Sequence, residues 1–180
     1  MAIDYRSLTS KQLLGLLGDE LFRESEIEDK IRELALQIQH DWLPDPLHIV
    51  PILPGAGPFL HEMLQWIKLP VAVHKFHVSL TGDGKFEYFG MSDMPKKVLI
   101  VDDMISSGQT LDLVGKALFE LGVEEAQIAV LFHKGFVPMD AIYCNYVGFK
   151  LSSNVPVVGW GSDFKGFFRN LRSLRLLKGT

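Results

Sequence analysis

The feature that most constrains this chain is a hydrophobic segment that ends in two adjacent acids. Residues 97–101 have the apolar character of a buried strand, and Asp102 and Asp103 follow directly. A short loop of serines and glycine then leads into a predicted helix at residues 109–121, and the next strand is predicted at residues 127–132. This order predicts a βαβ unit with parallel strands. Ligands of such units gather at the carboxyl ends of the strands.

The loop after the two acids has the chemistry of a phosphate site. Free backbone N–H groups at a helix start attract anions, and Gly108 allows a ligand to approach the backbone closely. Ser107 and Thr110 add hydroxyl donors. Asp102 and Asp103 suit ribose hydroxyls or, through water, Mg²⁺. A capped helix after an ordinary strand is the structural alternative, but apposed carboxylates cost stability unless something neutralises them.

Composition sets the class of protein and its expected location. The 180 residues are 47% hydrophobic and 22% charged, and the mean hydropathy of +0.15 indicates one globular domain. A net charge of −4 argues against nucleic acid as the principal partner. The single cysteine, Cys144, excludes an internal disulfide, and the start of the chain lacks signal-peptide features, so we expect a cytosolic protein. Its apolar segments are too short for a transmembrane helix.

The rest of the chain predicts alternating helices and strands. Leucines at residues 13–21 have helical spacing, and Ser25 with Glu28 forms a capping-box pattern for a second helix that ends before Pro44. The glycines of residues 81–94 predict a mobile loop or weak hairpin there. The remaining predicted elements are strands at residues 47–52, 71–78, 146–151 and 155–159 and a helix at residues 59–67.

Residues 98–111 resemble the phosphoribosyl-diphosphate (PRPP) signature of type I phosphoribosyltransferases. The resemblance implies an α/β fold in which helices flank a central, mainly parallel sheet and a small hood covers one end. It places one domain over residues 1–180, with a core at about residues 45–145 and a hood built from the N-terminal residues and about residues 146–180.

Two further segments are similar to hypoxanthine-guanine phosphoribosyltransferases. One is the carboxyl-terminal pattern of residues 146–149, 157–164 and 168–171. The other is residues 131–134, in which Lys134 takes the place of the lysine that donates to the purine O6. Alone, Lys134 is a solvated surface lysine, and its purine role depends on the combined matches.

This resemblance implies transfer of the 5-phosphoribosyl group from PRPP to N9 of hypoxanthine or guanine with Mg²⁺, giving IMP or GMP and pyrophosphate. It also implies a homodimer or homotetramer. The implied residues are, for catalysis, Asp102, Asp103 and Ser106; for the 5′-phosphate, Ser106, Ser107, Gly108, Gln109 and Thr110; for pyrophosphate, Gly55, Ala56 and Arg169; for the purine, Lys134, Val157, Met104, Pro156 and Asp163; and for the metal, Asp163, Asp102 and Asp103.

Departures from the family pattern keep two alternatives open. Ser106 stands where the family usually has an aspartate that acts as acid and base, and residues 52–56 lack the usual lysine. Pro156 replaces the aromatic residue that stacks on the purine, for which Trp160 is a partial substitute. A phosphoribosyltransferase for another base, such as xanthine or a pyrimidine, is one alternative. A non-catalytic nucleotide- or PRPP-binding regulatory protein is the other.

The remaining candidate sites are weak. His74 and His77 are spaced so that they face opposite sides of a strand, which is poor geometry for one metal ion. Cys144 lacks a local catalytic signature and is predicted to be a small core residue.

Overall fold

A parallel sheet organises the described part of the chain, which comprises residues 7–80, 86–90, 94–135, 143–152 and 155–178 of the computed structural model. Its five strands run in the order β3-β2-β6-β7-β8, and all four pairings are parallel. The predicted parallel α/β sheet is therefore confirmed. The strands are β2 (Leu47–Pro51), β3 (Val71–Val73), β6 (Lys97–Ile105), β7 (Glu125–Lys134) and β8 (Tyr146–Leu151).

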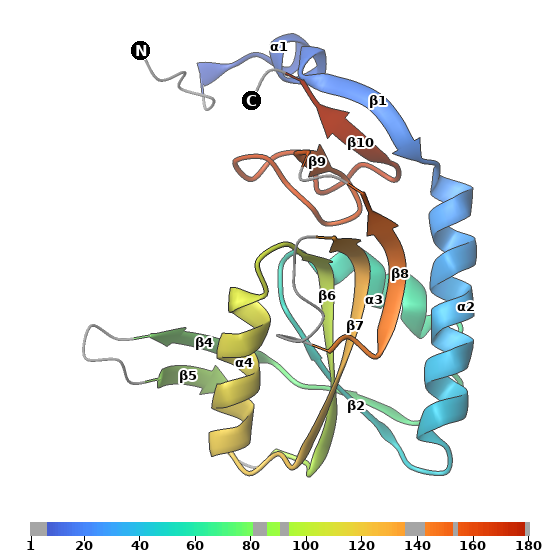
Figure 1. Cartoon of the computed structure of the whole chain (residues 1–180), viewed down its shortest axis with the longest axis vertical. Helices are drawn as coiled ribbons and strands as arrows, with labels where there is room; N and C mark the ends of the chain where they lie inside the picture. Colours follow the sequence, from blue (N-terminus) through green and yellow to red (C-terminus); the bar gives the residue numbers. More distant parts are fainter. Residues whose placement is uncertain (1–6, 81–85, 91–93, 136–142, 153–154, 179–180) are drawn as a thin grey trace.

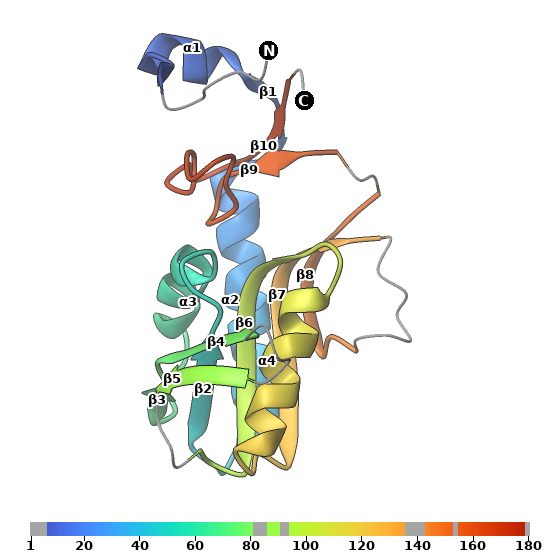
Figure 2. The same cartoon turned by 90° about the vertical axis from the view of Figure 1, so that its left-hand side faces the viewer.

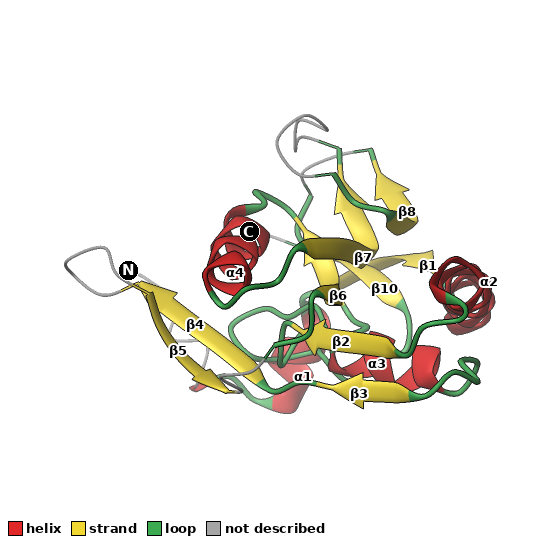
Figure 3. Cartoon of the chain, turned by 90° about the horizontal axis from the view of Figure 1, so that it is seen from below, coloured by secondary structure: helices red, strands yellow, loops and turns green. Residues whose placement is uncertain are grey.

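Helices cover both faces of this sheet (Figure 3). On one face, α2 (Glu24–Trp42) and α3 (Gly57–Leu64) pack against a cluster that includes Leu99 and Val101 of β6. On the other face, α4 (Gln109–Glu120) packs against a cluster that includes Val98 and Ile100. Alternate residues of β6 thus serve two cores, which is why the strand is a continuous apolar run. None of the described helices combines the length and apolarity needed to cross a membrane.

A small antiparallel sheet forms the hood above the carboxyl ends of the core strands (Figures 1 and 2). It runs in the order β1-β10-β9, so residues from near both chain ends pair with each other. A short helix, α1 (Ser10–Gly15), precedes it. The strands are β1 (Leu17–Phe22), β9 (Val157–Val158) and β10 (Leu174–Leu177). The predicted hood is confirmed, and its strand β10 is not among the strands that the sequence predicts.

The hood and core differ in extent from the prediction. β8 belongs to the core sheet, so the core continues beyond residue 145. The helix α2 also packs on the core rather than in the hood, because its buried face, which includes Ile31 and Leu34, joins the cluster beneath the sheet. The N-terminal region therefore contributes only β1 to the sheet of the hood.

Two predictions for the N-terminal region are wrong. The leucine-rich helix ends at Gly15, and Leu17 and Leu21 lie in β1, because pairing with β10 offers backbone partners that leucine spacing does not reveal. The capping box of α2 is formed two residues earlier than predicted: the Arg23 N–H donates to Glu26 Oε2 at 2.8 Å. The predicted end of this helix before Pro44 is confirmed.

The predicted strand at residues 71–78 is two strands. β3 ends at Val73, and β4 (Phe76–Leu80) leaves the main sheet to pair antiparallel with β5 (Phe86–Gly90). Of the range 81–94, for which a loop or weak hairpin is predicted, residues 86–90 form a strand, but the strand that pairs with it, β4, precedes that range. Residues 81–85 and 91–93, including Gly82 and Gly84, lie outside the described residues.

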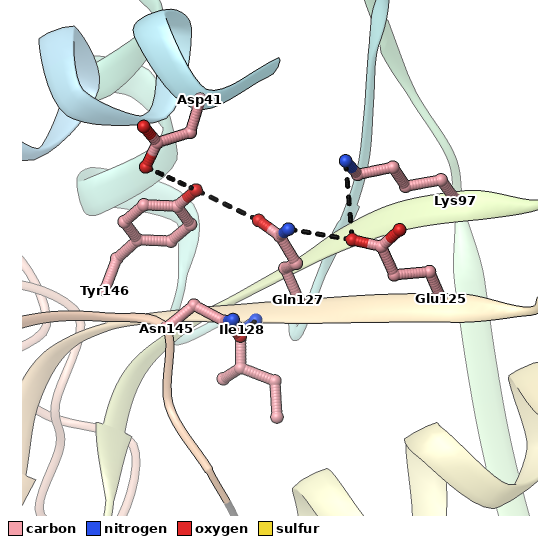
Figure 4. A network of polar contacts seen from close by, with 7 residues as sticks. All are labelled: Asp41, Lys97, Glu125, Gln127, Ile128, Asn145 and Tyr146. Atoms are coloured by element: carbon pink, nitrogen blue, oxygen red, sulfur yellow. Dashed lines mark hydrogen bonds and ion pairs between the residues drawn. The ribbon is translucent and has the colours of Figure 1, made fainter.

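Polar contacts join the amino-terminal ends of the core strands, at the edge opposite the hood (Figure 4). Tyr146 Oη lies 2.9 Å from Gln127 Oε1 and 3.3 Å from Asp41 Oδ2 at the end of α2. Gln127 Nε2 donates to Glu125 Oε1 at 2.8 Å, and the same oxygen lies 3.3 Å from Lys97 Nζ. These contacts hold together the starts of β6, β7 and β8. The carboxyl ends of these strands, at the opposite edge of the sheet, are not part of this network.

Two leucines of α2 provide a matched test of this packing. Leu34 is 3% exposed in the core, whereas Leu36 on the same helix is 50% exposed. Leu34→Ala should lower the free energy of unfolding by about 2–5 kcal/mol, because it leaves a cavity. Leu36→Ala should cost less than about 1 kcal/mol. Urea denaturation measures both, and equal losses would contradict the assigned core face.

Candidate active site

The acid pair lies at the carboxyl end of β6, under the hood. Asp102 is 7% exposed, and Asp103 is half-buried. The Asp103 N–H donates to Asp102 Oδ1 at 2.9 Å, so the backbone of one acid supports the carboxylate of the other. Two buried neighbouring carboxylates are an expensive arrangement, and such arrangements concentrate at functional sites.

Burial controls the protonation of both acids. Loss of water and the nearby Asp103 charge raise the pKa of Asp102 to about 8. Burial also raises the pKa of Asp103, but the hydrogen bond from Ser162 and the positive charge of Arg169 pull that pKa down. Within the pair, Asp102 is therefore the carboxyl group that retains its proton more readily, and Asp103 is the carboxylate whose negative charge is better stabilised.

The loop after the acids encloses a small cavity of about 40 Å³. Gly108 has a φ of 79° and caps α4, a left-handed conformation that favours glycine. Ser107 Oγ accepts the Gln109 N–H at 3.4 Å. Gln109 is the one predicted phosphate residue that does not line the cavity, whose walls are Asp102, Met104, Ile105, Ser106, Ser107, Gly108, Thr110 and Leu111.

The turn after β2 presses against Asp103. A Cβ atom at Gly55 would lie 2.0 Å from Asp103 Oδ1, so only glycine fits there. The N–H of Ala56 donates to Ile52 O at 3.0 Å within the turn. Of the two residues predicted to contact pyrophosphate, Gly55 is the one that touches the acid pair, whereas the N–H of Ala56 is already used.

A hood turn closes the other side of Asp103. Ser162 Oγ donates to Asp103 Oδ2 at 2.5 Å, and a Cβ atom at Gly161 would lie 1.9 Å from Gly55 O. Arg169 donates to Gly161 O at 2.5 Å and forms an ion pair with Asp163 Oδ1 at 2.5 Å. The acid pair, the turn after β2 and the hood turn therefore meet at one point.

Lys134 is the last residue of β7, next to the cavity-lining loop. The preceding residue, His133, pairs with Ile105 in the parallel register, which brings Lys134 level with Ser106 at the same sheet edge. Burial lowers the pKa of the Lys134 ammonium. The predicted position of this lysine at a strand end is confirmed.

The other predicted purine contacts have mixed surroundings. Met104 is half-buried against the first core cluster, Val157 is buried in β9, and Pro156 is exposed. Trp160 is only 3% exposed, and the Arg172 guanidinium lies 5.4 Å from its ring centroid. Its ring is thus a packed part of the hood, and the sequence-based suggestion that it stacks on a purine gains no support.

The three aspartates predicted to hold metal do not form one cluster. Asp163 is engaged by Arg169 and by the Gly166 N–H, 2.6 Å from its Oδ2. Within the described ranges, no group of three or more His, Cys, Asp or Glu side chains is arranged around a metal position. Asp102 and Asp103 nevertheless fit Mg²⁺, which is commonly held by one or two carboxylates together with substrate phosphates and water.

Comparison with known proteins decides the family. Residues 18–165 match the model of the phosphoribosyl transferase domain. The chain belongs to the phosphoribosyltransferase family. This phosphoribosyltransferase is also 29% identical over 170 residues to a hypoxanthine-guanine phosphoribosyltransferase of Staphylococcus aureus strain Mu50. The alignment covers 90% of this chain and 94% of the relative.

Solved structures agree with this assignment. A crystal structure of a Staphylococcus aureus hypoxanthine phosphoribosyltransferase in an orthorhombic space group superposes with a TM-score of 0.82 and 29% identity, over 95% of this chain and 98% of that chain. A Bacillus anthracis hypoxanthine-guanine phosphoribosyltransferase with a HEPES molecule in its active site has a TM-score of 0.80 and 26% identity, over 89% and 99% of the two chains. The fold is therefore that of the type I phosphoribosyltransferases.

Two contacts of this phosphoribosyltransferase are not predictable from local sequence. Ser162 gave no local signal, because its partner Asp103 is 59 residues away. His74 was considered with His77, but its ring partner is His48: Nδ1 of His48 lies 2.9 Å from Nε2 of His74. The predicted core role of Cys144 is confirmed, since it packs against the second core cluster and burial raises its pKa to about 11.

The raised pKa of Asp102 predicts a pH-dependent stability. Between its unfolded pKa of about 4 and its folded pKa of about 8, the folded chain holds a proton that the unfolded chain has lost. Without Mg²⁺ or ligand, the free energy of unfolding should therefore fall as pH rises through this window, by up to about 1.4 kcal/mol per pH unit from this group.

Urea denaturation at pH 5, 6 and 7 and constant ionic strength measures the effect. Asp102→Asn should flatten the slope, whereas Asp112→Asn, at an exposed position on α4, should retain it. If the free energy of unfolding of Asp102→Asn depends on pH as strongly as that of the wild type, the proton is held by another group.

Proposed function

We propose that this enzyme acts in purine salvage and transfers the 5-phosphoribosyl group from PRPP to N9 of hypoxanthine or guanine. The observation that carries the proposal is that the acid pair, the loop cavity and Lys134 lie at one edge of the sheet under the hood. The names of the similar relatives support the choice of base. The cytosol is the expected setting, and a homodimer or homotetramer is the expected assembly.

The reaction exchanges one bond at the anomeric carbon for another. The C1′–O bond to pyrophosphate breaks and takes its electron pair to the leaving group, and a ring nitrogen of the base forms the new C1′–N9 bond. The base then loses one proton, so the products are IMP or GMP, pyrophosphate and H⁺. The transition state resembles a cation, and the site must hold both reactants in line and stabilise the leaving group.

The phosphate and ribose are held by the strand end and loop. Ser106, Ser107, Gly108 and Thr110 line the cavity that would take the 5′-phosphate, at the N-terminus of α4. Asp102 and Asp103 are placed to accept hydrogen bonds from ribose hydroxyls. Members of this family typically depend on Mg²⁺, which would supply positive charge between these carboxylates and the diphosphate.

Pyrophosphate would be met from the hood and the turn after β2. Arg169 is a hood cation whose positive charge lowers the pKa of Asp103, and its guanidinium forms an ion pair with Asp163. Pyrophosphate binding would therefore compete with Asp163 for Arg169. Gly55 allows the turn to approach closely, because any Cβ there would collide with the Asp103 carboxylate.

Base selection would rest on Lys134. An ammonium donates hydrogen bonds and cannot accept them, so it favours a 6-oxo purine over a 6-amino purine. Ser106 hydrogen-bonds without taking a proton near neutral pH, so we assign the proton released by the base to solvent water. This assignment distinguishes the chain from relatives that have a carboxylate at the position.

One assay tests the proposal: formation of nucleotide and pyrophosphate from PRPP, Mg²⁺ and each base of a panel. Hypoxanthine or guanine should be the best acceptor. Turnover only with xanthine or a pyrimidine would favour a different base specificity. Tight PRPP or GMP binding without product, even in Ser106→Asp, would instead favour a non-catalytic nucleotide-binding protein.

Lys134→Ala should raise the KM for guanine by about tenfold or more, because a charge-assisted hydrogen bond to the base is lost. The KM for PRPP should change far less. Lys150→Ala, at an exposed position on the neighbouring strand β8, is the matched control and should leave both constants unchanged. Equal increases in the two KM values for Lys134→Ala would count against its assigned role.

A further inference from the structure

We propose that Ser162 is a positioning residue that holds the Asp103 carboxylate from the hood. Its hydroxyl donates to Asp103 Oδ2 at 2.5 Å, and the serine is only 6% exposed. A buried hydroxyl with an ionisable partner forms a strong, directional hydrogen bond. The catalytic consequence rests on the proposed role of Asp103, but the positioning itself does not.

The turn that carries Ser162 has a defined shape. Gly159 and Ser162 form two backbone hydrogen bonds with each other, at 2.9 and 3.0 Å. Between them, Trp160 has a φ of 46° and Gly161 a φ of 95°, so both central residues are left-handed, as in a type I′ turn. This turn type delivers the following residue in a fixed direction, which here is toward Asp103.

Contacts around Trp160 hold this turn despite an unfavourable residue at its first central position. Large side chains rarely adopt left-handed backbone conformations, so compensation is required. The Trp160 N–H donates to Leu171 O at 2.8 Å, and its Nε1 donates to Arg172 O at 2.5 Å. The Arg172 side chain covers the ring and forms ion pairs with Glu24 and Glu28 of α2. The turn is therefore anchored to the core.

Close packing prevents the turn from sliding over the site. A Cβ at Gly161 would collide with Gly55 O, and a Cβ at Gly55 would collide with Asp103 Oδ1. One carboxylate oxygen of Asp103 thus faces the turn after β2, and the other accepts the Ser162 hydroxyl. These two contacts fix the carboxylate before any ligand arrives, which is the kind of preorganisation that favours binding.

Ser162→Ala removes the hydroxyl and tests this role. Crystal structures of both proteins should show Asp103 in one position in the wild type, and rotated or in several positions in the variant. The dissociation constant for PRPP with Mg²⁺, measured by calorimetry, should rise about tenfold. The KM for the purine should stay within about twofold, because Lys134 is unchanged. A general loss of structure would weaken both PRPP and purine binding and would not produce this difference.

Ser162→Thr keeps the donor and should retain PRPP affinity. Ser152→Ala, at an exposed position after β8, is the matched control and should behave as wild type. If Ser162→Ala does not purify folded, Ser162→Cys repeats the test with a weak donor of similar volume.

The proposal is overturned if Asp103 keeps the same single position in Ser162→Ala, or if PRPP affinity is unchanged. If neither protein binds PRPP, the proposed function fails, and the position of Asp103 in the two crystal structures alone decides the role of Ser162.

Discussion

The burial of two adjacent carboxylates at the end of β6 is the constraint on which the rest of the structure depends. Strand β6 must be deeply covered, because it serves a core on each face of the sheet, and Asp102 and Asp103 continue that strand. Their charges therefore lie where water is scarce, and each needs compensation. The surrounding loop, turn and hood supply backbone groups, one hydroxyl and one guanidinium for that purpose.

This constraint explains why the hood and the core form one site. Gly55 and Gly161 allow backbone to come close enough to enclose Asp103, and Ser162 places a donor on it. The hood itself depends on distant partners, since β1 pairs with β10 and Arg172 binds two glutamates of α2. A change in the hood thus acts on the acid pair through packing, without touching a ligand directly.

The sequence predicts the elements that depend on local interactions, and it does not predict contacts between distant residues. The strand, acids, loop and helix of residues 97–121 are predictable, because apolar runs, helix-start residues and glycine act over a few positions. Leucine spacing predicts a helix where the chain forms β1, because that spacing fits both structures and the strand partner Leu177 lies near the other end of the chain. The contact of Ser162 with Asp103 and that of His48 with His74 are unpredictable for the same reason, because only the fold brings the two residues of each pair together.

We propose that the buried acid pair accepts a diphosphate ligand only when a divalent cation neutralises it. Calorimetric titration of the wild-type protein with PRPP, in Mg²⁺ and then in excess EDTA at equal ionic strength, tests this most directly. We expect tight binding with Mg²⁺ and an affinity at least about 100-fold weaker without it, because the uncompensated negative charges of the site and the diphosphate repel each other. Equal affinity in both conditions would contradict it.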